Sequence, residues 1–296
     1  MRSFMRFIIT ISISILALSG CANLGIQTST KAQVSLTPVT EHSTGKSHPG
    51  KFIWHDLVTP DPVAAGGFYK ALFGWKVDYQ DDYAVVRNGD KLIAGILKVK
   101  PKEGREKKGV WLPSVSVTDV DAAAKLVTTN GGSILKGPAD MGQRGRAVLI
   151  SDSQHADLVL LDTRNNDPED SPAAIGDWLW DEVWTDNPEA TEAFYAEVVG
   201  YDQMVSSNQY DVFMHSEKMR AGLRHVDSET KNRLWVPVVR VADPELIIQR
   251  VAELGGHVLL RPNEAPSTGD TALIADPTGA LLLVQRWPSQ TTVEGK

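Results

Sequence analysis

The chain has 296 residues, with 37 acidic side chains against 30 basic ones and a net charge of −7. This acidic balance argues against a nucleic-acid-binding protein and against a basic patch that binds anionic lipid. Cys21 is the only cysteine, which excludes an intramolecular disulfide and a cysteine-rich metal site.

The first twenty residues are predicted to be an export signal. Arg2 and Arg6 precede an apolar run at 7–18, which is shorter than the roughly 20 apolar residues that a membrane-spanning helix needs. The run ends in Leu-Ser-Gly-Cys at 18–21, which resembles the lipobox of bacterial lipoproteins. That resemblance implies cleavage before Cys21 and a lipid on its thiol. The alternative is a plain signal peptide with a chance cysteine.

The resemblance to lipoproteins also implies a location. Ala22 follows the cysteine where an inner-membrane retention signal carries Asp, so we expect a lipid anchor in the outer membrane, facing the periplasm. Residues 21–50 are rich in Ser, Thr, Gly and Gln and are expected to be a flexible tether. Removal of the two arginines with the signal leaves 28 basic and 37 acidic residues, a net charge of −9.

The rest of the chain, about 245 residues, is long enough for two domains and contains a tandem duplication. Motifs of the first half return in the same order in the second half. The offset between paired motifs stays between 124 and 127 over more than 100 residues. The pairs include Trp54 and Trp180, Asp56 and Glu182, Phe68 and Phe194, Gly95 and Gly222, Trp111 and Trp235, and Asp152 and Asp276.

Each copy is predicted to contain a strand, a helix and three strands, twice over. Alternation predicts the first strand at 52–59, and Asp61 can cap a helix that Gly74 ends. The charged stretch 100–108 is expected to be a solvated loop. The other elements expected in the first copy are strands at 75–78, 83–87, 91–99 and 111–117, a helix at 119–129, and strands near 133, at 147–151 and at 158–161.

These motifs resemble those of the vicinal oxygen chelate superfamily, which includes glyoxalases, bleomycin-resistance proteins and extradiol dioxygenases. The Trp-x-Asp/Glu strings, the Phe-Tyr pairs and Asp-Pro-Thr-Gly-Ala at 276–280 carry the resemblance. It covers residues 51–163 and 175–288. The implied fold class is α+β, with two glyoxalase-like domains. Each domain would hold two βαβββ units that curl into an open eight-stranded cup around a small-molecule site.

Members of the superfamily hold a divalent metal with His and Glu, and the resemblance implies where those ligands would stand. All six positions are apolar here, so no metal and no cofactor are expected. Among the histidines, His55 should face the helix side, because strand neighbours point to opposite faces. His225 is the best remaining candidate ligand. The six positions are Trp54, Leu112, Val159, Trp180, Val236 and Leu283.

The side chains expected in the cups form a tryptophan wall with one carboxylate in each copy. Such a wall suits a ligand with a flat or apolar body and a donor or cationic group. The alternative is that the tryptophans only fill space left by lost metal ligands. No catalytic residue is predicted, because no acid or nucleophile accompanies the carboxylates. The candidate ligand-binding residues are Trp54, Asp56, Ser114, Arg146, Trp180, Glu182 and Trp184.

Three functions remain open from the sequence. The first is metal-independent binding or sequestration of a small molecule by an envelope lipoprotein, without catalysis. The second is an enzyme, a glyoxalase-like lyase or isomerase or a dioxygenase, against which the missing metal ligands speak. The third is a structural, partner-binding lipoprotein with filled cups. The ligand and the oligomeric state are not indicated by the sequence.

Overall fold

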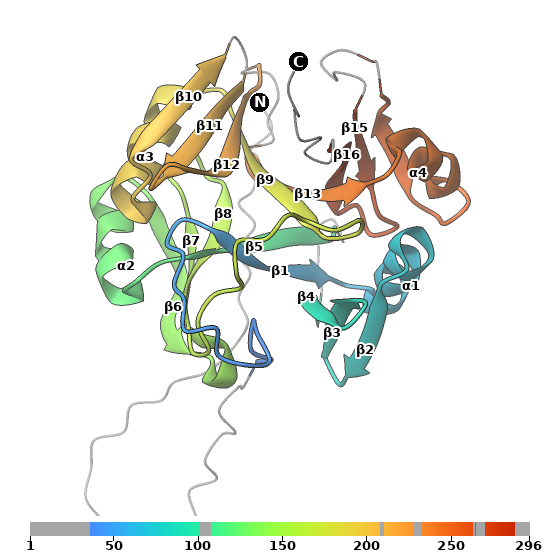
Figure 1. Ribbon diagram of the computed structural model, residues 1–296, viewed down its shortest axis with the longest axis horizontal. Helices are drawn as coiled ribbons and strands as arrows, with labels where there is room; N and C mark the ends of the chain where they lie inside the picture. The colour runs from blue at the N-terminus through green and yellow to red at the C-terminus, as the bar shows by residue number, and fades with distance from the viewer. Residues whose placement is uncertain are drawn as a thin grey trace, which may run out of the picture.

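The computed structural model describes residues 36–100, 108–207, 210–227, 233–262, 264 and 270–287, which form two eight-stranded sheets and four α-helices (Figure 1). The expected signal peptide, Cys21 and the first part of the expected tether lie outside these residues. So do positions 101–107 of the charged loop. Within the described residues, no helix is long and apolar enough to cross a membrane.

Each sheet is built from two units of one strand, one helix and three strands, which confirms the α+β class and the tandem duplication. The first copy contains β1 (Phe52–Thr59), α1 (Pro62–Phe73), β2 (Lys76–Gln80), β3 (Tyr83–Asn88), β4 (Lys91–Lys98), β5 (Val110–Ser116), α2 (Val120–Thr129), β6 (Ser133–Asp140), the 3₁₀ turn η1 (Gly142–Arg144), β7 (Gly145–Ser151) and β8 (Asp157–Thr163). The second contains β9 (Trp178–Thr185), α3 (Pro188–Val199), β10 (Gln203–Ser207), β11 (Tyr210–His215), β12 (Lys218–His225), β13 (Leu234–Val241), α4 (Pro244–Val251), β14 (His257–Leu260), β15 (Thr271–Ala275) and β16 (Leu281–Arg286).

The first strands of the two units lie side by side at the centre of each sheet. In the first sheet β1 pairs antiparallel with β5. On the outer sides of this pair, β4 runs parallel to β1 and β8 runs parallel to β5. The full order is β2-β3-β4-β1-β5-β8-β7-β6, and the second sheet repeats it as β10-β11-β12-β9-β13-β16-β15-β14. The outermost strands of a sheet do not pair with each other, so each sheet is an open cup rather than a closed barrel.

Helix α1 begins and ends at the residues that the sequence indicated. Asp61 accepts a hydrogen bond from the backbone N–H of Ala64, and Asn187 does the same for Ala190 at the equivalent helix. Gly74 closes α1 with a φ of 76°, in the left-handed region where a side chain costs energy. Local chemistry therefore places the helix ends before any tertiary packing is considered.

The two domains share their hydrophobic cores. One core joins the first unit of domain 1 to the last unit of domain 2, and the other joins the two middle units. Figure 1 shows the result, with α1 beside α4 and α2 beside α3. The hydroxyl of Tyr69 donates to Asp276 at 3.1 Å, and the equivalent Tyr195 donates to Asp152 at 2.8 Å. Each domain thus completes the core of the other.

Residues 36–50, called the N-terminal strap below, pack on the folded domains. Val39 is only 4% exposed, and the hydroxyl of Thr44 donates to the backbone oxygen of Asp167 at 2.7 Å. The expectation of a flexible tether is therefore wrong for this part of the chain. Composition favoured flexibility, but Val39 finds an apolar site and the strap hydroxyls find acceptors in the loop between the domains.

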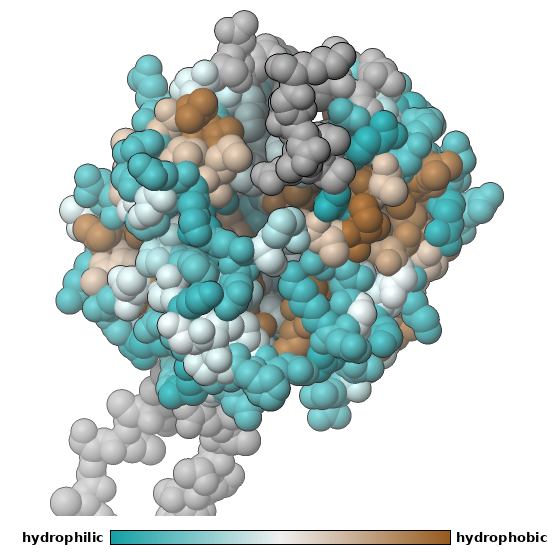
Figure 2. Space-filling view, viewed as in Figure 1, coloured by the Kyte–Doolittle hydropathy of each residue, from teal (hydrophilic) through white to brown (hydrophobic). Residues whose placement is uncertain are grey.

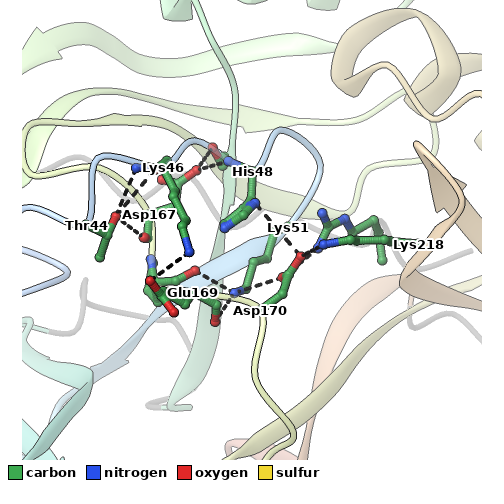
Figure 3. Close-up of polar contacts among 11 residues, drawn as sticks. Thr44, Lys46, His48, Lys51, Asp167, Glu169, Asp170 and Lys218 are labelled. Carbon is green, nitrogen blue, oxygen red and sulfur yellow. Dashed lines mark hydrogen bonds and ion pairs between the residues drawn. The ribbon is translucent and has the colours of Figure 1, made fainter.

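The strap meets the interdomain loop in a polar clasp (Figure 3). Asp170 of the loop lies 3.1 Å from Lys51, 2.6 Å from Lys218 and 2.9 Å from Arg220 of domain 2. Burial alone would raise the pKa of Asp170, but the hydrogen bonds from these three cations outweigh it and hold the pKa well below its usual range. Asp170 therefore stays ionised and joins the interdomain loop to both domains.

The surface is mostly polar. The face in Figure 2 is largely hydrophilic, with separate small apolar patches, as expected for a chain with many charged residues. Among the described residues, large exposed apolar side chains include Val63, Val205 and Leu246, which lie on different elements.

Candidate binding sites in the two cups

The strand register places the predicted residues on the inner face of each cup. Trp54 on β1 stands opposite Ser114 on β5, and Asp56 stands opposite Leu112. Directly paired residues share a face of the sheet, so these four side chains line one surface. In the second cup the same register sets Trp180 against Val238 and Glu182 against Val236.

In the first cup, Asp56 is held by three donors. Its Oδ1 accepts hydrogen bonds from the indole of Trp54 at 3.0 Å and from the hydroxyl of Tyr83 at 2.8 Å. Arg144 lies 3.4 Å from the other carboxylate oxygen, donates to Tyr83 at 2.9 Å and stacks 4.1 Å above the Trp54 ring. Trp54 is 1% exposed and Arg144 3%. The Asp56 carboxylate, which is 17% exposed, is therefore already paired with donors from three side chains.

A cavity of about 90 Å³ remains in the first cup. Ligand pockets for small molecules are usually about 300–1,000 Å³, so this space is too small for an ordinary ligand as it stands. Its lining includes the predicted Ser114. The full lining is Leu36, Asp56, Ser114, Lys136, Met141, Arg144, Ala147, Leu149, Val159 and Leu161.

The second cup repeats the arrangement with a longer acid. Glu182 forms a two-point ion pair with Arg224, at 2.8 Å and 3.1 Å, and accepts a hydrogen bond from the indole of Trp184 at 3.2 Å. The indole of Trp180 donates to the hydroxyl of Tyr210 at 2.6 Å. Glu182 is buried, but both tryptophans are only partly buried. The second cup is therefore the more open one.

The two tyrosines act as donors to the carboxylates. Burial, followed by the charge of Asp56, raises the pKa of Tyr83 well above its usual value. Burial and then the charge of Glu182 raise the pKa of Tyr210 in the same way. Both phenols therefore keep their protons, and neither can serve as a base near neutral pH.

Two glycines make room for these tyrosines. A Cβ added to Gly95 would collide with the hydroxyl of Tyr83 and with Asp56, and one added to Gly222 would collide with the hydroxyl of Tyr210. The tyrosines themselves were missed by sequence reasoning, although they repeat at an offset of 127. The repeated glycines were recognised only as a mark of the duplication.

The sequence predicted a different arginine in the first cup from the one that the structure places there. Arg146 was expected to contribute to the first cup, but it points to the helix side and forms a two-point ion pair with Asp121, at 2.6 Å and 2.8 Å. Arg144 enters the cup instead, because it lies in η1, where strand alternation does not apply. Arg224 reaches the second cup from β12, in the first unit of its domain, whereas Arg144 belongs to the second unit of domain 1.

The histidines have other partners. His55 points away from the cup, as its strand position indicated, and its Nε2 lies 2.9 Å from Asp181 of the other domain. His225, the remaining candidate ligand, is paired with Asp211 at 2.6 Å. Within the part of the chain that the structure describes, neither histidine is hydrogen-bonded to Asp56 or Glu182.

The metal of the superfamily does not fit these residues. The six positions implied for ligands carry Trp, Leu and Val, which offer no suitable donor. The carboxylates of Asp56 and Glu182 are each paired with an arginine. Across the part of the chain that the structure describes, no group of three His, Cys, Asp or Glu side chains could hold a metal ion.

Fold and sites together define an α+β protein with two tandem cups, each holding an arginine-paired carboxylate. The profile of the Glyoxalase/Bleomycin resistance protein/Dioxygenase superfamily matches residues 51–160, and that of a glyoxalase-like domain matches residues 180–284. The chain therefore belongs to the glyoxalase/bleomycin resistance/dioxygenase superfamily and carries two tandem glyoxalase-like domains.

Two relatives match most of this chain along most of their own length. CFP32 of Mycobacterium tuberculosis, which bears the provisional name of a glyoxylase, is 28% identical over 78% of this chain and 92% of its own length. The anthracycline biosynthesis protein DnrV of Streptomyces peucetius is 27% identical over 78% of this chain and 91% of its own.

Solved structures show the same fold at low identity. The Mn(II)-bound glyoxalase of Novosphingobium aromaticivorans is 11% identical, with a TM-score of 0.57 over 81% of this chain and 83% of that one. The 2,2',3-trihydroxybiphenyl 1,2-dioxygenase of Sphingomonas wittichii strain RW1 is 13% identical, with a TM-score of 0.56 over 81% of this chain and 91% of that one.

Proposed function

We propose that this protein is a lipid-anchored protein of the bacterial cell envelope that binds a flat, largely apolar small molecule in its second cup without a metal ion. The contrast between the cups carries this proposal. Trp180 and Trp184 are partly exposed beside the buried Glu182–Arg224 pair, whereas Trp54 in the first cup is fully buried.

The Glu182–Arg224 ion pair favours a neutral ligand over a cationic one. Both oxygens of Glu182 are held by Arg224, so a cationic ligand would have to displace a two-point, partly buried pair. A neutral ligand that stacks on the indoles avoids that cost and gains apolar burial. The relatives named for anthracycline biosynthesis are consistent with this class, because anthracyclines contain fused planar rings.

The anchor part of the proposal rests on the first 21 residues. A charged start, a short apolar run and Leu-Ser-Gly-Cys at 18–21 support lipid attachment at Cys21 and a periplasm-facing location. In cells fed labelled palmitate, the wild type should take up label and Cys21→Ala should take up none. A variant that remains labelled and membrane-bound would refute the anchor.

An enzyme is the second candidate, and the provisionally named glyoxylase relative and the Mn(II)-bound glyoxalase fold favour it. Metal analysis distinguishes a metal-dependent enzyme from a metal-independent binding protein. After dialysis against Mn, Ni, Zn and Fe(II), the mature protein should retain less than one equivalent per cup, and its Tm should not respond to chelator. Stoichiometric metal that is lost in Asp56→Ala or Glu182→Ala would overturn metal independence.

Ligand binding is tested with a neutral anthracyclinone as the probe. Titration should quench tryptophan fluorescence of the wild type with saturation, and Trp184→Ala should weaken binding at least tenfold through the lost stacking surface. Trp287→Ala, which removes another half-exposed tryptophan outside the Glu182 network, is the matched control and should bind normally. Equal affinity of the wild type and Trp184→Ala would exclude the second cup as the site.

A further inference from the structure

The N-terminal strap enters the mouth of the first cup. The backbone N–H of Leu36 donates to the oxygen of Met141 at 3.0 Å, and Leu36 lines the cavity. The guanidinium Nε of Arg144 donates to the backbone oxygen of Thr37 at 2.5 Å. Val39 is buried in the same apolar cluster as Trp54. An apolar side chain, a carbonyl oxygen and a second apolar side chain thus occupy the cup from within the same chain.

The space beneath the strap holds a cation whose charge no described residue balances. Lys136 lines the cavity and makes no ion pair with any side chain in the described ranges, while the charge of Asp56 is met by Arg144. The rest of the lining is mainly apolar, with Met141, Leu149 and others around it. Apolar walls with an unpaired lysine favour an apolar molecule that carries an anionic oxygen group.

We propose that residues 36–39 are a lid that occupies the first cup in cis, and that its release opens a binding site for an apolar carboxylate. The carboxylate oxygens would take the place of the Thr37 carbonyl on Arg144 and pair with Lys136. The ligand's apolar body would replace Leu36 and Val39. This site is separate from the second cup and does not depend on ligand binding there.

The lid can open without unfolding the domain. Residues 36–39 form no helix or strand, and they precede β1. The cup holds them through one backbone hydrogen bond to Met141, one hydrogen bond from the Arg144 side chain, and the packing of Leu36 and Val39. Segments with so few contacts open locally at a fraction of the free energy of global unfolding. The strap beyond Thr40 stays tied to the interdomain loop, so the open lid remains tethered near the cup.

The test uses the mature chain with the lid loosened by Leu36→Ser and Val39→Ser together, which adds no carboxylate of its own. The probe is 8-anilinonaphthalene-1-sulfonate, an apolar ring system with an oxyanion. We expect severalfold higher dye fluorescence than in the wild type, with a cooperative melt retained. Adding Lys136→Glu should abolish the gain, and a synthetic peptide of residues 36–42 should displace the dye. Val63→Ser, at a 70% exposed valine, should behave as wild type.

Three results would overturn the lid. They are a cooperatively folded double variant with wild-type fluorescence, a gain that survives Lys136→Glu, and a dye that the peptide does not displace. If the double variant loses its cooperative melt, the single variant Leu36→Ser is tested in its place, and the same three results would overturn the lid. The anthracyclinone titration of the second cup should be unchanged in the lid variants, so failure of either proposal can be told from failure of the other.

Discussion

Gly95 on β4 and Gly222 on β12 leave the space in which a tyrosine hydroxyl reaches the carboxylate of its cup. Neither glycine has a positive φ, so backbone conformation does not require it. The requirement is steric, because an added Cβ would enter the volume of the Tyr83 or Tyr210 hydroxyl. At the scale of single residues, the polar network of each cup thus depends on a glycine, because any side chain there would displace the tyrosine hydroxyl.

Gly222→Ala should destabilise the protein by about 1–3 kcal/mol, the usual cost of overpacking a close-packed interior. Adding Tyr210→Phe should restore part of the loss, because it removes the colliding hydroxyl. Gly67→Ala is the control, since a Cβ there meets nothing within 4 Å and lies in a helix that favours alanine. Chemical denaturation measures the free energy of unfolding of all three variants, and an undiminished value in Gly222→Ala would contradict the steric role.

Asp157, at the start of β8, makes stability depend on pH. Burial raises its pKa to about 6, against a hydrogen bond from Ser151 that lowers it, and the charge of Asp152 adds to the rise. A raised folded-state pKa means that this group's contribution is present below its unfolded value near 3.8 and is lost as pH rises through 6. Asp157→Asn should therefore gain about 1–2 kcal/mol over wild type at pH 8 and nothing at pH 3.

The two central strands β1 and β9 meet at the axis that relates the two domains. His55 and Asp181 stand at the same position of the repeat, 126 residues apart, and their side chains are 2% and 3% exposed. His55 also stacks on Trp178 with ring centroids 4.0 Å apart. If the two copies had kept the same residue at this position, two identical side chains would face each other. Two aspartates or two protonated histidines would repel. At the scale of elements, divergence of the copies has produced a complementary pair.

Breaking this pair should be costly. His55→Ala or Asp181→Ala should each destabilise the protein by about 3–5 kcal/mol, because each leaves a buried polar partner unpaired. Exchanging the residues, His55→Asp with Asp181→His, should recover part of that loss and give a favourable coupling energy in a double-mutant cycle. An exchange that is as unstable as the two single losses added together would show that the pairing itself contributes nothing.

At the scale of the whole molecule, the domains are interlocked rather than strung together. Each core takes one unit from each domain, and the Tyr69–Asp276 and Tyr195–Asp152 hydrogen bonds cross the boundary in opposite directions. The clasp around Asp170 adds ion pairs from both domains to the connecting loop. Because of this reciprocal packing, we expect the two domains to unfold as one unit.

The mature chain should therefore melt in one calorimetric transition, with equal van't Hoff and calorimetric enthalpies. A fragment of residues 51–163 should expose apolar surface of α1 and α2 and fail to melt cooperatively. Two separate transitions, or a stably folded monomeric fragment, would show that the domains are independent.

Local patterns allowed much of the fold to be predicted. The helix cap at Asp61, the closing Gly74 and strand alternation act within a few residues, so their effects can be inferred from the sequence alone. Alternation also placed Trp54, Asp56 and Glu182 on the inner faces. The duplication added a second, independent reading of each element, which is why the cups were predicted correctly.

The partners of those side chains could not be inferred in the same way. Arg144 and Arg224 reach the carboxylates from non-equivalent units, Arg146 turns away, and the strap packs against residues more than 100 positions later. No sequence period links such residues, because their contacts arise only when each sheet curls into a cup, the strap and the interdomain loop come together, and a turn such as η1 breaks the alternation. Side-chain direction along a strand is a local property, whereas charge pairing and closure of a cup depend on where distant segments come to lie.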